Sequence, residues 1–191
     1  IIMDKPLDAV TKGERQVSKP VNFGLIYGMM PPKLVIYAMA GYGVVMSASE
    51  AKTYWNRFFQ RYYGIKRWHD RVTRDGRASG VSRSIGGRIR YLDPALAWNE
   101  WKNNPVQSTG ADALKLALAY IHKEISKHGD AMKMIHIVHD EIILEVDDND
   151  ECANEAKSIL KVCMTKAMER FLKVVPVVVD PAEGYSWAEI H

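Results

Sequence analysis

Length, composition and charge exclude several classes of protein. The chain has 191 residues, of which 47% are hydrophobic and 26% charged, with a formal net charge of +3 at pH 7; this is the composition of a globular protein and not of a disordered one. No run approaches the roughly 20 uncharged apolar residues that a transmembrane helix needs, and the first residues lack the layout of a signal peptide. We therefore expect an intracellular protein that is not secreted and has no membrane partner.

The charge is distributed unevenly along the chain. Residues 57–90 contain ten Lys and Arg against two Asp, so this segment carries +8 and the remainder −5. Such a segment favours a polyanionic partner, and its interleaved aromatic residues suit a surface that contacts phosphates. A solvated helix face is the alternative. The two cysteines, Cys152 and Cys163, have no spacing typical of a zinc site or a disulfide framework, and we interpret them as core thiols.

The first part of the chain is predicted to be helical. Helical spacing extends over residues 9–30, and Gly28 and the Pro31-Pro32 pair are stop signals. Pro20 lies inside this segment, and proline removes a backbone donor and bends a helix interior. We therefore expect the helix either to begin near Ser18 or to be locally bent.

A second helix and a small β element are predicted next. Ser47 is followed three residues later by Glu50, which is typical of a capping box and predicts a helix that Gly64 ends or interrupts. Glycines punctuate residues 75–95, so we expect turns there, with a small β element at 84–91.

The second half of the chain predicts helices and antiparallel strands. Residues 111–122 have the nearly continuous apolar pattern of a buried helix. Two short β-rich runs, 134–138 and 142–146, indicate a hairpin with charged residues at its tip. A helix is expected over 148–172, and a final edge strand over 174–179, which a proline interrupts. This order indicates an α+β fold and not alternating βαβ units.

Four residues of the first helix form a candidate binding face. Arg15, Lys19, Phe23 and Tyr27 are spaced by four, so they follow one slowly turning stripe. Two cations followed by two aromatic rings suit a nucleoside triphosphate, because cations bind phosphates and aromatic rings stack on bases. An ordinary amphipathic helix gives the same spacing.

The predicted hairpin tip is a candidate metal site. His139, Asp140 and Glu141 stand between the two β-rich runs, and Mg²⁺ prefers carboxylate oxygens together with substrate phosphates. The alternative is a pair of solvated acids at a turn.

The literal residues of the first helix resemble a known family. The pattern Arg-x3-Lys-x3-Phe-Gly-x2-Tyr-Gly that begins at Arg15 resembles the nucleotide-binding helix of family A (DNA polymerase I-like) DNA polymerases. The resemblance implies that Arg15 and Lys19 bind the triphosphate of a dNTP. It also makes Lys19 a candidate proton donor to the pyrophosphate leaving group. Phe23 would lie beside the sugar, and Tyr27 would stack near the templating base.

Two further motifs are similar to the same family. His139-Asp140-Glu141 resembles its His-Asp-Glu motif, which implies Asp140 as the catalytic metal ligand, Glu141 as an auxiliary catalytic carboxylate and His139 near the primer terminus. The segment from Asn103 resembles the family's Asn-x-Pro-x-Gln-Gly-Thr-Ala-Ala-Asp sequence. Its amides, Asn103 and Gln107, could hydrogen-bond the minor-groove acceptors that all base pairs share.

The chain departs from the family pattern within and near this segment. Ser108 replaces the usual Gly, which is a mild change. Asn99 stands where the family generally has an Arg, so one expected primer contact is in doubt. The last residues, Gly184–His191, are similar to the family's C-terminus.

The resemblance implies a right-hand polymerase fold that is incomplete in this chain. We expect residues 1–93 to form the fingers subdomain, with the nucleotide-binding helix at about 12–29. Residues 94–191 would be the C-terminal part of an antiparallel-sheet palm that carries the His-Asp-Glu hairpin.

The implied function is that of a DNA-directed DNA polymerase. The partners would be primer-template DNA and a dNTP, and the cofactor two Mg²⁺ ions. The second carboxylate ligand is expected outside this chain, on an upstream polypeptide with the thumb and the rest of the palm. The chain would then be a fragment or a split subunit that is inactive alone. A single-subunit RNA polymerase and a noncatalytic nucleic-acid-binding remnant are the alternatives.

Overall fold

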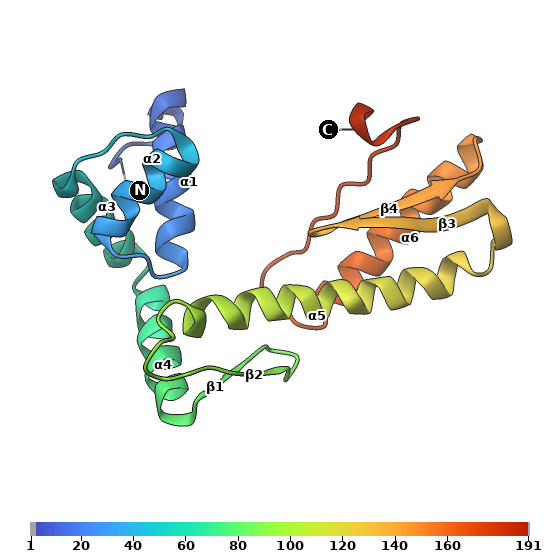
Figure 1. Cartoon of the computed structure of the whole chain (residues 1–191). Helices are drawn as coiled ribbons and strands as arrows, with labels where there is room; N and C mark the ends of the chain where they lie inside the picture. Colours follow the sequence, from blue (N-terminus) through green and yellow to red (C-terminus); the bar gives the residue numbers. More distant parts are fainter. Residues whose placement is uncertain (1–2, 191) are drawn as a thin grey trace. The chain divides into compact units, whose positions relative to one another are not determined.

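The computed structural model describes residues 3–190, and their contacts divide the chain into two units (Figure 1). Unit 1 comprises the described residues up to Ser82 together with Ile89–Pro105. Unit 2 comprises Arg83–Arg88 together with the described residues from Val106 onward. Each unit has its own buried cluster of hydrophobic side chains.

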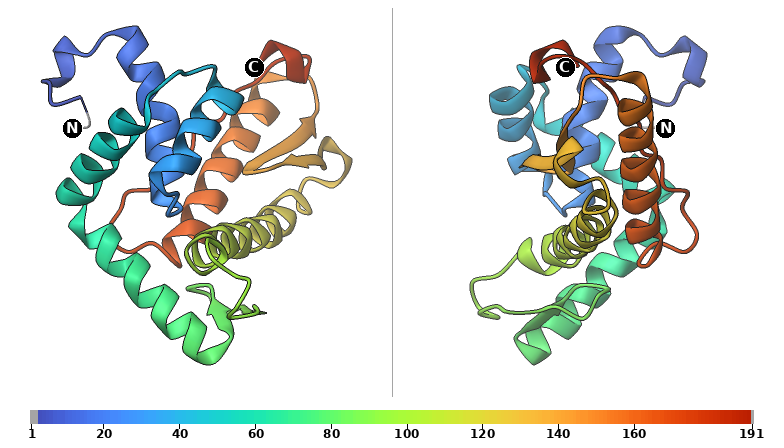
Figure 2. Two further views of the ribbon diagram at one scale, coloured as in Figure 1. Left: turned by 60° about the vertical axis from the view of Figure 1, so that its left-hand side comes forward. Right: turned by 90° about the vertical axis from the view of Figure 1, so that its right-hand side faces the viewer.

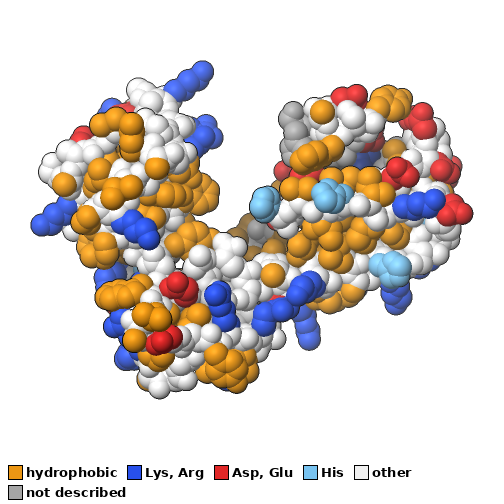
Figure 3. Space-filling view, in the orientation of Figure 1, with side chains coloured by type: hydrophobic (Ala, Val, Ile, Leu, Met, Phe, Trp, Pro, Cys, Tyr) orange, Lys and Arg blue, Asp and Glu red, His pale blue; other side chains and the backbone are white. Residues whose placement is uncertain are grey.

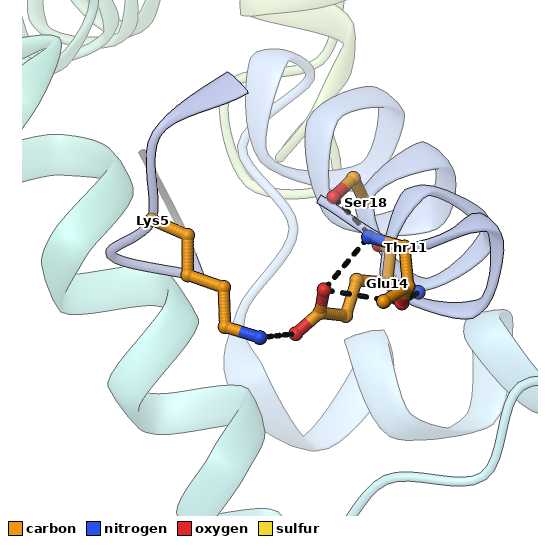
Figure 4. A network of polar contacts seen from close by, with 4 residues as sticks. All are labelled: Lys5, Thr11, Glu14 and Ser18. Atoms are coloured by element: carbon orange, nitrogen blue, oxygen red, sulfur yellow. Dashed lines mark hydrogen bonds and ion pairs between the residues drawn. The ribbon is translucent and has the colours of Figure 1, made fainter. Parts of the chain in front are cut away.

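Unit 1 begins with a short 3-10 turn, Leu7–Ala9, and the helix α1, Lys12–Ile26. A capping box that the sequence prediction missed begins α1: Glu14 N donates to Thr11 Oγ1 over 3.2 Å, and Thr11 N donates to Glu14 Oε2 over 2.9 Å (Figure 4). Because α1 begins at Lys12, the alternative of a start near Ser18 is wrong. Pro20 lies in the helix interior, fully buried.

Helix α2, Pro31–Tyr42, is a second element that the sequence prediction missed. The two prolines were interpreted only as stop signals for the preceding helix. They also occupy the first turn of α2, where a backbone N–H has no partner within the helix, so proline costs little there. Gly43, with a φ of 63°, ends α2 in the left-handed conformation.

Helices α3, Ala48–Arg61, and α4, Tyr63–Ser79, follow with only Tyr62 between them. The predicted capping box of α3 is confirmed, since Glu50 N donates to Ser47 Oγ over 3.2 Å. The expected turns at 75–79 are wrong, because these residues are helical. Gly76 serves packing there: a Cβ on it would lie 2.3 Å from Trp101 Cε3.

Two short strands, β1 (Val81–Arg83) and β2 (Ile89–Tyr91), form the small β element that was predicted. The core of unit 1 brings together side chains from α1, α2 and α3 and from the residues between α2 and α3. Its buried members are Val21, Leu25, Leu34, Ala38, Val44, Met46, Ala51, Phe58 and Phe59.

Helix α5, Glu100–Ile125, is longer than the predicted 111–122 and contains Pro105 in its interior. Its first turns are held by packing, since Trp101 is fully buried, and tertiary contacts outweigh the lost backbone bond. Within unit 2, a 3-10 turn, Gly129–Ala131, leads into the strands β3, Met132–Val138, and β4, Glu141–Val146.

The predicted hairpin is confirmed. β3 and β4 pair antiparallel with Val138 opposite Glu141, and the register shifts between Met134 and His136. Helix α6, Asp150–Glu169, packs against β4 and covers one face of the hairpin (Figure 2). The buried cluster of unit 2 consists of Ala117, Ile121, Ile125, Met132, Ile142, Ala156, Cys163 and Ala167.

The predicted final strand at 174–179 is wrong, because these residues have no regular secondary structure. Their β propensity is high, but a strand needs a hydrogen-bonded neighbour, and proline removes one donor of the ladder. A last 3-10 turn covers Trp187–Glu189. Across the part of the chain that the structure describes, no helix has the length and apolar character to cross a membrane.

Candidate functional site

The first three residues of the stripe are exposed on α1, the fourth, Tyr27, is half-buried at the C-cap, and the opposite side of the helix is buried. Arg15 and Lys19 are exposed, and Phe23 is 54% exposed. Val21 and Leu25, on the other side, have no exposed surface. The side of the helix that carries the stripe therefore presents two cations and an aromatic ring to solvent.

Capping contacts keep the acidic residue of the first turn away from this stripe. Glu14 accepts hydrogen bonds from the Lys5 ammonium over 2.5 Å and from the Thr11 backbone N–H (Figure 4). These bonds, that of Lys5 first, lower the pKa of Glu14 to about 2. Among the ion pairs of the described residues, none involves Arg15 or Lys19. Both cations are therefore available for an anionic ligand.

The C-terminal end of α1 is fixed by α4 and α5. His69 of α4 is buried, and its Nε2 lies 2.7 Å from the Ile26 carbonyl oxygen, to which the neutral ring can donate. Burial lowers the pKa of His69 and so favours the neutral ring. Tyr27 ends the helix, and Gly28 follows with a φ of 78°. Glycine suits this position because it adopts a positive φ without strain, and a Cβ there would also displace the end of the Lys102 side chain, whose Cδ lies 2.5 Å away.

In unit 2 a cavity of about 500 Å³ brings together three of the predicted site residues. His139 and Asp140 reach it from the hairpin tip, and Gln107 from α5. Helix α5 also contributes apolar side chains, and α6 contributes two methionines. The other lining residues are Gly110, Ala111, Ala113, Leu114, Ala117, Met164 and Met168.

The tip of the hairpin has an unusual backbone. The two-residue turn consists of His139 and Asp140, and His139 has a φ of 54°, in the left-handed region. Both side chains are exposed. A residue with a side chain that is held in this conformation costs free energy and is enriched at functional sites. Glu141 follows as the first residue of β4, and its Oε1 accepts a hydrogen bond from Trp187 Nε1 over 2.9 Å.

Asn103 and Gln107 lie one helical turn apart on α5, and both are exposed. Their amides therefore project from the same side of this helix. An amide offers both a donor and an acceptor, which suits contacts to bases of any sequence.

The chain is similar to a known protein family over nearly its whole length. The model of DNA polymerase family A matches residues 1–189. The chain belongs to DNA polymerase family A. This family resemblance, predicted from the three motifs, is confirmed.

Bacterial members of family A are similar over nearly the whole chain. DNA polymerase I of Aquifex aeolicus is 38% identical over 192 residues, which are 99% of this chain and 32% of that protein. DNA polymerase I of Streptococcus pneumoniae is 33% identical over 191 residues, which are 95% of this chain and 20% of that protein. The chain thus spans a third or less of these relatives.

A solved structure shows the same fold. The POL domain of Pol1 from M. smegmatis, in complex with DNA primer-template and dNTP, matches with a TM-score of 0.75 and 25% identity. The match covers 87% of this chain and 30% of that one. The predicted mixed α+β fold, a partial polymerase fold with a small antiparallel sheet, is confirmed.

One polar cluster of this family A chain was missed by sequence reasoning. Asp112 of α5 accepts hydrogen bonds from Ser84 Oγ and Arg88 Nε, each over 2.6 Å. Thr109 Oγ1 accepts from the backbone N–H of Ile85 over 3.0 Å. These contacts hold residues 83–88 on α5. The signals in the sequence were the polar residues inside an otherwise apolar helix pattern and their place in the motif that begins at Asn103.

Close packing also supports this cluster. A Cβ on Gly86 would lie 2.8 Å from Asp112 Oδ2 and 3.0 Å from Phe171 Cε1. The Ser84 hydroxyl, followed by the Arg88 guanidinium, holds the pKa of Asp112 below its ordinary value. Asp112 thus remains ionised and fixes the loop within one to two turns of Gln107 along α5.

The site residues fall into two sets. Arg15, Lys19, Phe23 and Tyr27 belong to unit 1, and Gln107, His139, Asp140 and Glu141 belong to unit 2; Asn103 belongs to unit 1 by its contacts. No group of three or more His, Cys, Asp or Glu that could hold a metal occurs among residues 3–190. The adjacent carboxylates of Asp140 and Glu141 are hard oxygen donors. They fit Mg²⁺, which typically takes one or two protein carboxylates and completes its shell with phosphates and water.

Proposed function

We propose that this chain supplies the nucleotide-binding helix of a DNA-directed DNA polymerase and one of the carboxylate motifs of its catalytic centre. The reaction is template-dependent transfer of a dNTP to a primer 3′-OH. The observation that supports the proposal best is on α1, where two exposed cations, which form no ion pair among residues 3–190, precede an exposed phenylalanine. In a family A chain this face has the chemistry of a dNTP site. Residues 1–93 would be the fingers and residues 94–191 the C-terminal part of the palm.

Each residue of the stripe has a separate role in this proposal. Arg15 and Lys19 bind the triphosphate, because a guanidinium and an ammonium form charge-assisted hydrogen bonds to phosphate oxygens. Lys19 also donates a proton toward the departing pyrophosphate, as a general acid. Phe23 lies against the sugar, and Tyr27 stacks near the templating base.

Residues of unit 2 act on the DNA and the reacting groups. Asp140, with Glu141 as auxiliary, would hold Mg²⁺, which when bound stabilises the charge that develops on the phosphoryl group. The expected number of ions is two. His139 lies beside Asp140 at the same tip and would contact the primer terminus. Asn103 and Gln107 hydrogen-bond the minor groove of the primer-template, where the acceptor pattern is nearly independent of sequence.

The hairpin offers a surface for the rest of the palm. In β3, Ile135 is 55% exposed and Ile137 39% exposed. Hydrophobic side chains also gather on the visible face of the hairpin and along α5 (Figure 3). β3 pairs only with β4 among the strands of the described residues. Apolar side chains on an open strand suit an upstream polypeptide that carries the thumb, the rest of the palm and the second carboxylate ligand.

A primer-extension assay tests the proposal. The chain is mixed with primer-template, dNTPs and Mg²⁺, with and without the upstream polypeptide, and extension is expected only with it. In the assembled enzyme, Asp140→Ala should abolish extension, and Lys19→Ala should slow it by on the order of a hundredfold or more. Asp148→Ala is the matched control, because Asp148 is an exposed aspartate at the other end of β4.

Three results would contradict parts of the proposal. Robust extension by the chain alone would refute the need for the upstream polypeptide. An Asp140→Ala enzyme with full activity would support a noncatalytic nucleic-acid-binding remnant. Faster incorporation of rNTPs than of dNTPs would support an RNA polymerase.

A further inference from the structure

The C-terminal segment of the chain folds into a structured turn. Its 3-10 turn, Trp187–Glu189, is closed by a hydrogen bond from Ile190 N to Trp187 O over 3.3 Å. The Glu189 carboxylate folds back and accepts from the Tyr185 backbone N–H over 2.8 Å. The turn is therefore held by its own side-chain and backbone contacts.

A second contact ties the segment just before this turn to α6. Lys157 Nζ of α6 lies 2.7 Å from Glu183 Oε2. An exposed ion pair contributes little free energy, but it restricts where the following residues can lie. The chain between Glu183 and the turn is only three residues long.

The turn delivers the indole of Trp187 to the hairpin. Trp187 Nε1 donates to Glu141 Oε1 over 2.9 Å. The indole has a single donor and no acceptor, so this contact uses all of its hydrogen-bonding capacity. A carboxylate acceptor makes the bond charge-assisted and stronger than a neutral one. Glu141 in turn follows Asp140 directly and pairs with Val138 across the hairpin.

We propose that Trp187 is a positioning residue that orients the Glu141 carboxylate at the metal-binding tip of the hairpin. This inference rests on the proposed polymerase function. The indole fixes one oxygen of Glu141, so the carboxylate keeps one orientation beside Asp140. Partners of metal-binding carboxylates typically change metal affinity or activity about 10- to 100-fold when they are removed. Since Trp187 is 50% exposed, we expect the lower end of this range.

A spectroscopic experiment tests the contact itself. The chain has five tryptophans, so ¹⁵N-labelled protein gives five indole N–H signals, and Trp187→Phe identifies the signal of Trp187. Glu141→Ala should shift that signal and speed its hydrogen exchange, because the indole loses its acceptor. Asp148→Ala should leave it in place. An unshifted Trp187 signal in the Glu141→Ala chain would overturn the inference.

A second experiment tests the positioning role in the complete polymerase that contains this chain. Trp187→Phe keeps an aromatic ring at this position and removes the N–H donor. It should raise the Mg²⁺ concentration for half-maximal extension about tenfold and leave the KM for dNTP unchanged. Trp98→Phe is the matched control, because Trp98 is an exposed tryptophan, 66% exposed, that contacts Arg77 and lies outside the proposed site.

The outcomes separate this inference from the proposed function. An unchanged Mg²⁺ dependence in the Trp187→Phe enzyme would refute the positioning role, even with the hydrogen bond present. An equal change in KM for dNTP would indicate a general structural effect and would also refute it. If the unmodified enzyme shows no Mg²⁺-dependent extension, the proposed function fails, whereas the indole signals still decide whether the contact exists.

Discussion

The Asp112 cluster gives the sharpest test of how the site is supported. Asp112→Asn preserves the shape of the side chain but removes its charge and replaces one acceptor oxygen with a donor. In the folded chain, Ser84 Oγ and Arg88 Nε each donate to this carboxylate over 2.6 Å, and Arg88 Nη2 lies 2.5 Å from Oδ1. The substitution therefore weakens every one of these contacts.

The size of the effect follows from the exposure of the two partners. Hydrogen bonds to charged groups contribute about 1.5–3 kcal/mol when they are shielded from water. The Asp112 side chain is 12% exposed, but that of Arg88 is 46% exposed, so solvent screens part of the attraction. We expect Asp112→Asn to lower the free energy of unfolding of unit 2 by about 2 kcal/mol.

A matched control is available in unit 1. Asp75 lies 2.9 Å from Arg74 Nη2, with side chains that are 59% and 74% exposed. Exposed pairs contribute about 0–1 kcal/mol, so Asp75→Asn should have little effect. The comparison shows whether the loss of stability comes from the burial of the carboxylate or only from the presence of an arginine beside it.

The effect should depend on pH with a defined sign. The Ser84 hydroxyl and then Arg88 lower the pKa of Asp112 in the folded chain, whereas the unfolded value is about 3.9. The stabilisation is thus fully present above about pH 4 and is lost as the pH falls through the folded pKa. The difference between wild type and Asp112→Asn should be constant from about pH 7 to pH 5 and should shrink at lower pH.

The assay combines denaturant unfolding with amide hydrogen exchange. Because the chain has two units, exchange of the Ile85 amide, which donates to Thr109 Oγ1, reports local opening of this cluster. Equal stability of wild type and Asp112→Asn at pH 7 would refute the reasoning. So would an equal loss in Asp75→Asn, or a difference that persists unchanged at pH 3.

Three further predictions concern packing, pH and DNA contacts. Gly76→Ala should lower the free energy of unfolding, measured in a thermal melt, by about 1–3 kcal/mol, because the new Cβ would overlap the buried ring of Trp101. A more stable variant would contradict the close contact between Gly76 and Trp101. Burial lowers the pKa of His69, so stability should be highest above the unfolded pKa of about 6.5 and should fall as the pH drops below it, because the unfolded chain then binds more protons. In His69→Gln this dependence of stability on pH should flatten. An unchanged dependence would exclude His69 as its cause. Gln107→Ala should slow extension by a similar factor on primers of different terminal sequence, and a loss confined to one terminal base pair would contradict minor-groove contact.

Local signals in the sequence predicted several elements correctly. The capping box at Ser47, the antiparallel hairpin and the helix that follows it depend on residues within a few positions of each other. The stripe on α1 also depends only on helical spacing. The structure adds that Arg15, Lys19 and Phe23 are exposed and that Val21 and Leu25 are buried opposite them.

Errors arose where one residue type has two physical uses. Pro31 and Pro32 end one helix and begin the next, and both uses are compatible with the same residues. Gly76 suggested a turn but lies inside α4, because glycine also permits close packing against a large ring. The segment 174–179 has strand composition but forms no ladder, because pairing depends on a neighbour that composition does not specify.

The sequence by itself determined the family, because the three motifs are short and contiguous and their residues can be identified without coordinates. Only the tertiary structure decided which distant residues support them. The Trp187 indole meets Glu141 across 46 positions, and Ser84 meets Asp112 across 28. Such contacts form when the packing of helices and strands brings remote segments together. The periodicity of one segment does not specify which other segment it will contact.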